Sequence, residues 1–378
     1  MDRDYEAFCL ADRLFFDVQG VDGSAGDDFA PLLPDPGPQW TQLTRDVWRV
    51  LWPSGAVARR QGWKIHASAT MDNAERVLTE VHRYCVARKI PFKYLRTRSI
   101  LLARNSKYAP RSASGKLITI YPADDAEFAR VLTELAAVLE GERGPYILSD
   151  LRYGGGPLYA RYGGFAEQWV EHGGKRVPAI AKPDGTLVPD LRKPVFAVPG
   201  WVQVPACLGP HLARRKAGDP GQFPFQVTKS LHFSNGGGVY LATRESDGTQ
   251  VVLKEARPFC GLDREHADAV TRLDREHQIL TLLAGIPGVP AVYERFRSGS
   301  TNSWRWSTWL VRPSAVGWRP TTRSPISRVR AKWPSTASAC SPSSTGSRRC
   351  STRCTSAAWS SAICTGATSC STSTTLSA

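Results

Sequence analysis

The stretch Gly62–Thr70 most constrains the fold of this chain, because it reads G-W-K-I-H-A-S-A-T. Successive side chains of a β-strand point to opposite faces of the sheet. The polar residues of this stretch therefore share one face, namely Lys64, His66 and Ser68. The large apolar residues share the other face and are expected to pack into a core. One strand thus presents a cation and a proton-transfer group on the same side.

A helix and a second strand are predicted directly after this strand. The helix is expected from Asn73 to about Lys89, with Asp72 as its cap and apolar residues at helical spacing. The second strand is expected at residues 91–95 and carries Lys93. If the two strands are neighbours, Lys93 lies near the polar face and forms a cation cluster without a carboxylate from the same strands. Such a cluster suits an anionic substrate, and an ordinary solvated face is the alternative.

The remaining segments of the first 219 residues mix strands and helices, which is typical of an α+β domain. Strands are expected at residues 48–52, 99–103, 117–121, 195–198 and 201–204. Helices are expected from residue 124 or 125 to about 139, and from 208 to 216. The sequence Ala217-Gly218-Asp219-Pro220 is typical of a linker, so the first domain is predicted to cover residues 1–219.

Residues 144–165 form a segment rich in glycine and tyrosine that contains Arg152 and Arg161. Glycine lets the backbone approach a ligand closely, and arginine binds phosphate oxygens with two parallel hydrogen bonds. Two arginines beside a lysine and histidine cluster therefore predict a phosphate site. A structural loop in which arginine stacks on tyrosine is the alternative.

These residues carry a resemblance to a known family. Residues 1 to about 296 resemble the front part of class III lanthipeptide synthetases, whose amino-terminal domain is similar to the phosphothreonine lyases of bacterial effectors. The stretches that carry the resemblance are Phe8–Asp12, Gly62–Thr70, Asn73–Val77, Lys107–Arg111, Gly115–Pro122, Gly144–Phe165 and Phe233–Tyr240.

The resemblance implies elimination of phosphate from phosphoserine or phosphothreonine in a ribosomal precursor peptide, without a metal or other cofactor. A neutral lysine must remove the α-proton, and neighbouring cations lower its pKa. We assign this base to Lys93, the acid that protonates the leaving phosphate to His66, and stabilisation of negative charge to Lys64. Arg152 and Arg161 correspond to the family's phosphate-binding arginines. Lys107 and Arg111 are secondary candidates for the same role.

Residues 220–296 resemble the small lobe of a protein kinase, an antiparallel sheet with one helix. In that lobe a glycine loop covers the ATP phosphates, a lysine on the third strand grips them, and a helix glutamate pairs with the lysine. The corresponding residues are Gly236, Gly237, Gly238, Lys254 and Glu276. The loop departs from the usual pattern, because His232 and Ser234 stand where the first two glycines would be. ATP and Mg²⁺ are the cofactors that an intact kinase of this type implies.

Residues 297–378 have a different character. Residues 298–378 include 34 Ser or Thr, and no Asp or Glu occurs after residue 296. A disordered basic tail is one interpretation, although six tryptophans and five cysteines are unusual for disorder. The other is a frame change near codons 297–301. In the shifted frame codons 301–310 can encode E-F-L-A-M-E-Y-V, and codons 358–372 can encode V-V-F-G-D-L-H-x-G-N-x-L-L-D, which has the D-x-x-x-x-N spacing of a kinase catalytic loop. We therefore expect a truncated kinase without the cyclase domain, so that elimination is the step this chain retains.

The distribution of charge weighs against nucleic acid as a partner. The net charge is +15, but residues 1–296 carry 38 basic residues against 34 acidic ones. The excess lies in the tail, without a recognised binding motif. No apolar run reaches 18 residues and the amino terminus is polar, so a cytoplasmic protein without membrane contact is expected. An inactive fragment that only binds the leader of the precursor peptide is the alternative function.

Overall fold

The computed structural model describes residues 27–56, 59–217, 223–298 and 304–310. Three antiparallel sheets account for the strands in these ranges. The first sheet contains seven strands in the order β1-β2-β4-β5-β3-β7-β6. They are β1 (Trp40–Arg45), β2 (Trp48–Pro53), β3 (Gln61–Ala67), β4 (Phe92–Leu95), β5 (Ile118–Ile120), β6 (Leu151–Tyr153) and β7 (Leu158–Gly164).

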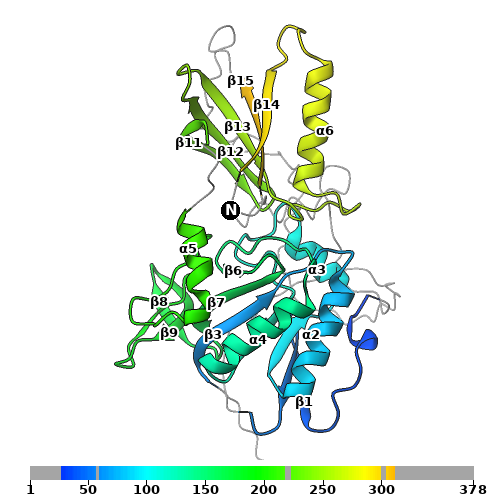
Figure 1. The fold of residues 1–378 in the computed structure, drawn as a ribbon, viewed down its shortest axis with the longest axis vertical. Coiled ribbons are helices and arrows are strands. Elements are labelled where there is room, and N and C mark those ends of the chain that lie inside the picture. The colour runs from blue at the N-terminus through cyan, green and yellow to red at the C-terminus, as the bar shows by residue number, and fades with distance from the viewer. Residues whose placement is uncertain (1–26, 57–58, 218–222, 299–303, 311–378) are drawn as a thin grey trace, which may run out of the picture. The chain divides into compact units, whose positions relative to one another are not determined.

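Two long helices cover one face of this sheet, as Figure 1 shows. Helix α2 (Ala74–Arg88) and helix α4 (Asp125–Val138) bury apolar residues against Ile65 and its neighbours on that face, in a single core. The cap of α4 is Asp124, whose side chain accepts a hydrogen bond from the backbone N–H of Glu127. The N-cap of α2 is Asn73, so the prediction of Asp72 was off by one residue.

Helix α3 (Arg98–Asn105) replaces the strand predicted at residues 99–103. The apolar run Ile100-Leu101-Leu102-Ala103 has no periodicity that separates a buried strand from a helix. Side-chain hydrogen bonds at the start of the segment favour the helix. The Thr97 side chain accepts one from the N–H of Ile100, and the Asp27 side chain accepts one from the N–H of Ser99. That prediction was therefore wrong.

The second sheet is small and follows the first along the chain. It contains β8 (Trp169–His172), β9 (Lys175–Ala181) and β10 (Leu187–Pro189) in the order β10-β9-β8. The strands predicted at residues 195–198 and 201–204 do not form, and apolar side chains of this segment pack directly on the first core. Prolines at positions 194, 199 and 205 remove backbone donors that a sheet ladder would need. Helix α5 (Gly209–Ala217) agrees with the helix predicted from residue 208.

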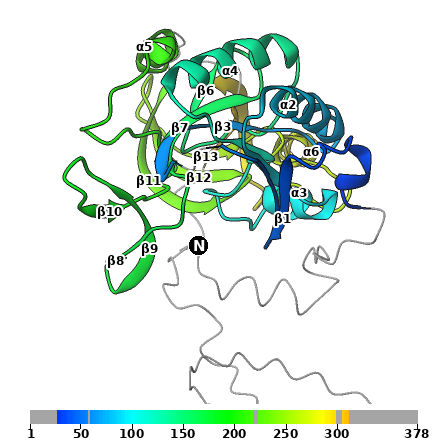
Figure 2. The same cartoon turned by 90° about the horizontal axis from the view of Figure 1, so that it is seen from below.

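The third sheet has the order β11-β12-β13-β15-β14. Its strands are β11 (Phe225–Ser234), β12 (Gly237–Arg244), β13 (Gln250–Ala256), β14 (Ala291–Ser298) and β15 (Trp304–Leu310). Helix α6 (Ala269–Leu282) packs against the last three of them, and Figure 2 labels it together with β11, β12 and β13. Strand β15 pairs with β13 and β14, so the interpretation of residues 297–378 as a disordered tail is wrong for residues 304–310, and the frame change stays a prediction. Tryptophan and threonine in this stretch favour a strand. The predictions for residues 311–378 lie outside the described residues.

Candidate active site

The polar face of the first sheet carries a row of side chains from five strands. Lys93 on β4 pairs with Thr119 on β5, Thr119 pairs with His66 on β3, and His66 pairs with Tyr159 on β7. Tyr159 in turn pairs with Arg152 on β6. The strands of Lys93 and His66 are thus not neighbours as supposed, because β5 lies between them. Their Cα atoms are about 10 Å apart by strand spacing, a span that two long side chains can bridge.

A second pair on the same face joins Lys64 to Arg161. The two residues are directly opposite on β3 and β7, and both are buried. The guanidinium of Arg161 makes an ion pair with Asp190, which follows β10. The Lys64 ammonium donates to the carbonyl of Gly164 at 2.8 Å. A carboxylate from a distant segment therefore neutralises part of the cation cluster.

His66 has a carboxylate partner of its own. The distance from His66 Nδ1 to Asp150 Oδ2 is 2.5 Å, and both side chains are buried. The carboxylate accepts the Nδ1 proton, which leaves Nε2 as the nitrogen that can exchange a proton with a substrate. Asp150 also accepts a hydrogen bond from the Ser149 hydroxyl at 2.6 Å.

The lysines of this face have lowered pKa values. Burial lowers the pKa of Lys64 well below its ordinary value, and the Arg161 cation adds to the effect. Burial lowers the pKa of Lys93 to about 8, with smaller effects from Arg192 and Arg45. Lys93 also lies over the rings of Trp48 and Tyr121, at 4.6 Å and 5.9 Å, contacts that favour its charged form. Burial thus favours the neutral amine at both Lys64 and Lys93, and the aromatic rings oppose this at Lys93.

Burial also dominates the protonation of the histidine. It lowers the pKa of His66 to about 3, while the Asp150 carboxylate acts in the opposite direction. Burial by itself would raise the pKa of Asp150, but the hydrogen-bonded His66 ring and the Lys116 ammonium hold it well below its usual range. His66 without a bound anion is therefore neutral at pH 7, and a phosphate dianion beside it would favour the imidazolium.

The other predicted phosphate ligands lie in different surroundings. Arg152 donates to the carbonyls of Gly155 and Gly156 in its own turn. Arg111 donates to the carbonyls of Ser234 and Gly237, at 2.9 Å and 3.3 Å, and so contacts the turn between β11 and β12.

Lys107 belongs to that same turn contact. Its carbonyl accepts the N–H of Asn235, and its ammonium lies 5.4 Å from the ring centre of Tyr108. Neither Lys107 nor Arg111 has a described hydrogen bond or ion pair to the residues around His66.

The residues predicted to bind ATP lie in the third sheet and on helix α6. Lys254 on β13 makes an ion pair with Glu276 on α6. Gly237 has a φ of +149°, and an added Cβ there would lie 2.0 Å from the carbonyl oxygen of Glu255. Gly236 and Gly238 are similarly close to neighbours, at 3.0 Å from Ala269 Cβ and 2.4 Å from the Tyr240 hydroxyl. Close backbone packing therefore accounts for Gly237, whereas the neighbour of Gly238 is the end of the Tyr240 side chain.

Sequence reasoning missed four charged residues around the polar face: Lys116, Asp150, Asp190 and Arg192. They come from loops or from the ends of strands, where no alternation marks them. Arg192 influences the pKa of Lys64, Lys93 and Lys116, although its own side chain is exposed. The Ser149-Asp150 dipeptide, two residues before Arg152, was the available signal for Asp150.

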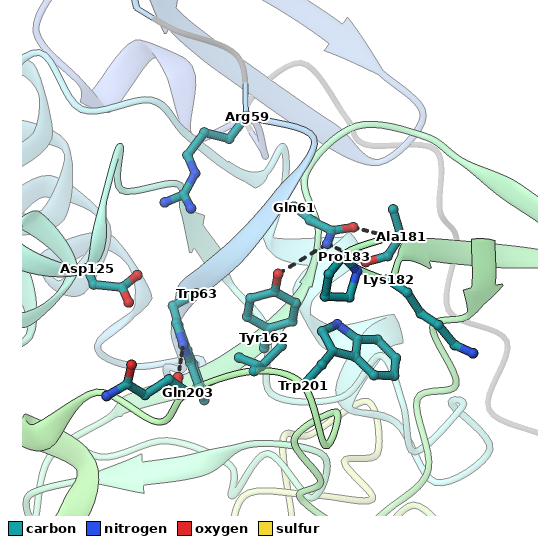
Figure 3. Close-up of a pocket in the computed structure, with 11 residues that line it drawn as sticks. Arg59, Gln61, Trp63, Asp125, Tyr162, Ala181, Lys182, Pro183, Trp201 and Gln203 are labelled. Atoms are coloured by element: carbon teal, nitrogen blue, oxygen red, sulfur yellow. Dashed lines mark hydrogen bonds between the residues drawn. The ribbon is translucent and has the colours of Figure 1, made fainter. Parts of the chain in front are cut away.

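A pocket of about 330 Å³ lies at the opposite face of the same two strands. Trp63 from β3 and Tyr162 from β7 line it together with Trp201, as Figure 3 shows. The amide of Gln61 is engaged there with the Tyr162 hydroxyl and with Ala181. Because side chains alternate along a strand, Lys64, His66 and Arg161 point away from this pocket.

Gly163 sets how closely the cation cluster can pack. An added Cβ would lie 2.6 Å from Arg161 Nη1, 3.0 Å from Asp190 Oδ2 and 3.2 Å from Lys64 Nζ. We expect Gly163→Ala to displace these side chains and to lower the free energy of unfolding by about 1–3 kcal/mol. Denaturant unfolding measures this loss, and Gly155→Ala, where nothing lies within 4 Å, is the matched control. Equal stability of the two variants would contradict the packing described.

The described residues contain no group of three or more His, Cys, Asp or Glu side chains placed to hold a metal ion. Among the described helices, none is both long and apolar enough to span a membrane.

Comparisons with known proteins place the chain in a family. The family model of the RamC amino-terminal domain matches residues 28–218. The chain is 47% identical over 299 residues to the probable SapB synthase of Streptomyces coelicolor, an alignment that covers 78% of this chain and 32% of that protein. The chain thus spans about a third of the length of this relative. The structure of the phosphothreonine lyase OspF from Shigella flexneri aligns with a TM-score of 0.29 and 12% identity, over 43% of this chain and 88% of that one. The chain belongs to the RamC amino-terminal domain family, and its relatives are class III lanthipeptide synthetases.

Proposed function

We propose that this chain eliminates phosphate from phosphoserine or phosphothreonine residues of a lanthipeptide precursor peptide. The observation that supports this proposal most strongly is the polar face of the first sheet. Lys64 and His66 are both buried on that face of β3, and Lys93 lies in the same cross-strand row as His66. In the reaction a base takes the α-proton, the Cα–Cβ double bond forms, and the Cβ–O bond to phosphate breaks. The leaving oxygen takes a proton from the acid.

The base can be either of two lysines. The sequence assigns it to Lys93, and this remains a proposal. Burial and the Arg161 cation lower the pKa of Lys64, and its Cα lies only about 7 Å along the strand from that of His66. Aromatic contacts favour a charged Lys93. We therefore prefer Lys64 as the base and Lys93 as the cation that stabilises negative charge on the substrate carbonyl.

His66 is the proposed acid. The dianionic phosphate raises the pKa of the imidazole on binding and then receives its proton from Nε2. Asp150 holds Nδ1–H and so fixes the ring.

Arg161 is the proposed phosphate ligand on the sheet, where Asp190 holds its guanidinium beside Lys64. Arg192 is a further candidate, because it is exposed and electrostatically coupled to the same lysines. Arg152, Lys107 and Arg111 keep a secondary place, because the described contacts of the two arginines are to backbone carbonyls and Lys107 lies beside Tyr108.

We further propose that the third sheet with α6 is the small lobe of a kinase-like domain. The Lys254–Glu276 ion pair supports this, and these two residues fit a site that would hold ATP. Bound ATP would supply the phosphoryl group for serine and threonine. The catalytic-loop residues expected for Mg²⁺ fall in residues 311–378 in a shifted frame, and resequencing of codons 290–378 tests that hypothesis.

Incubation with a synthetic phosphothreonine peptide tests the elimination. Each turnover is expected to remove about 98 Da, the mass of phosphoric acid, and to leave an alkene that adds thiols. Binding of the precursor leader without any loss of mass would support the alternative of an inactive binding fragment.

A further inference from the structure

A chain of hydrogen bonds connects His66 to a lysine outside the strands. Lys116 lies two residues before β5, and its ammonium donates to Ser149 Oγ at 3.3 Å. Ser149 Oγ donates to Asp150 Oδ1 at 2.6 Å, and Asp150 Oδ2 lies 2.5 Å from His66 Nδ1. Four side chains from three segments thus form one continuous line.

Lys116 is buried at a cost. Only 8% of its surface is exposed, and none of the ion pairs between residues that the structure describes includes it. Its other hydrogen bond goes to the carbonyl of Ser112 at 2.8 Å. Burial lowers its pKa to about 8, so the amine is still mostly protonated at pH 7. Burial of a cation without an ion pair costs free energy, which indicates a role for the charge.

Charged side chains from several segments act on the two ends of this line, His66 and Lys116. Asp150, Lys116 and Lys64 act on His66. Asp150, Asp190, Arg161 and Arg192 act on Lys116. Lys116 is therefore coupled electrostatically both to the histidine–aspartate pair and to the arginine that we propose for phosphate.

We propose that Lys116, acting through Ser149 and Asp150, is a positioning residue that fixes the His66 imidazole for protonation of the leaving phosphate. This inference rests on the proposed elimination. The Lys116 ammonium occupies a lone pair of Ser149 Oγ and turns its hydroxyl proton toward Asp150. The carboxylate is then held from two sides, and the ring it holds cannot rotate freely.

The charge of Lys116 has a second effect. A nearby cation disfavours the imidazolium, so the protonated His66 is a stronger acid than it would be without Lys116. The proton itself moves from His66 Nε2 to the leaving oxygen, and His66 regains a proton from solvent. Lys116 keeps its protons throughout.

The test compares Lys116→Met, Ser149→Ala and the charge-conserving Lys116→Arg with Lys175→Met, which removes an exposed lysine on β9. The first readout is the NMR signal of the His66 Nδ1 proton, assigned with His66→Asn and measured without substrate. The second is the pH profile of phosphate loss from the phosphothreonine peptide.

We expect Lys116→Met and Ser149→Ala to shift or broaden the Nδ1 proton signal and to slow elimination about 10- to 100-fold. In Lys116→Met the alkaline loss of activity should move to higher pH, because His66 then stays protonated longer. Lys116→Arg should restore the signal and most of the rate, and Lys175→Met should change neither.

An unchanged Nδ1 signal in folded Lys116→Met and Ser149→Ala would overturn the inference. So would a lower rate with an unmoved pH profile in Lys116→Met, since that is the result of a purely structural role. Absence of elimination by the wild-type chain would refute the proposed function instead, while the NMR comparison would still decide whether Lys116 positions His66.

Discussion

Replacement of His66 by asparagine is expected to slow phosphate elimination about a thousandfold, because the leaving oxygen then has no acid to protonate it. Asparagine is similar in size and can still donate a hydrogen bond to Asp150, so the buried carboxylate keeps a partner. The free energy of unfolding should therefore change little. Rates of phosphate release from a phosphothreonine peptide measure the effect, with circular dichroism melting as the control for folding.

His82→Asn is the matched comparison, because His82 is also buried but lies in α2, on the covered face of the sheet. That variant should retain elimination at close to the parent rate. If His66→Asn retained it too, His66 would not be the acid.

Replacement of Lys64 by methionine is expected to slow phosphate elimination about a thousandfold as well, since methionine fills the same space but cannot take the α-proton. Lys93→Met should cost about 100-fold, the effect of losing one charge-stabilising group. Both variants leave the ion pair of Arg161 with Asp190 in place. Measurement of elimination rates for the two variants therefore separates their roles.

The pH dependence gives an independent check on the same assignment. A lysine base must be neutral and the His66 acid must be protonated, so the rate rises with pH up to the pKa of the lysine and falls above the pKa of His66 in the complex. With Lys64 as base, whose pKa is lowered by burial, the rise is expected to end at a lower pH than for an ordinary lysine. If the elimination rate rose tenfold per pH unit below about pH 8, and if Lys93→Met lost more activity than Lys64→Met, the base would be Lys93.

The alternation of Gly62–Thr70 was sufficient to predict the central strand and its two faces. Lys64 and His66 share the buried polar face, while Trp63 and Ile65 pack into the helix-covered core. Alternation is a local property, so it could not give the strand order, and β5 separates the two strands that the sequence seemed to make neighbours.

The two carboxylates of the site could not be predicted from a local sequence pattern for the same reason. Asp150 reaches His66 across 84 residues of sequence, and Asp190 reaches Arg161 across 29. Both belong to loops or strand ends, whose path depends on tertiary packing. The sequence around Arg152 is typical of a phosphate-binding segment, but in the structure Arg152 contacts the backbone of its own turn.

The measurement that tests the central claim most directly is mass spectrometry of a phosphothreonine peptide after incubation with the wild-type chain and with His66→Asn. The account predicts a loss of about 98 Da per site with the wild type, and no detectable loss over the same time with the variant. Intact phosphopeptide in both reactions, with a folded wild-type chain, would contradict it.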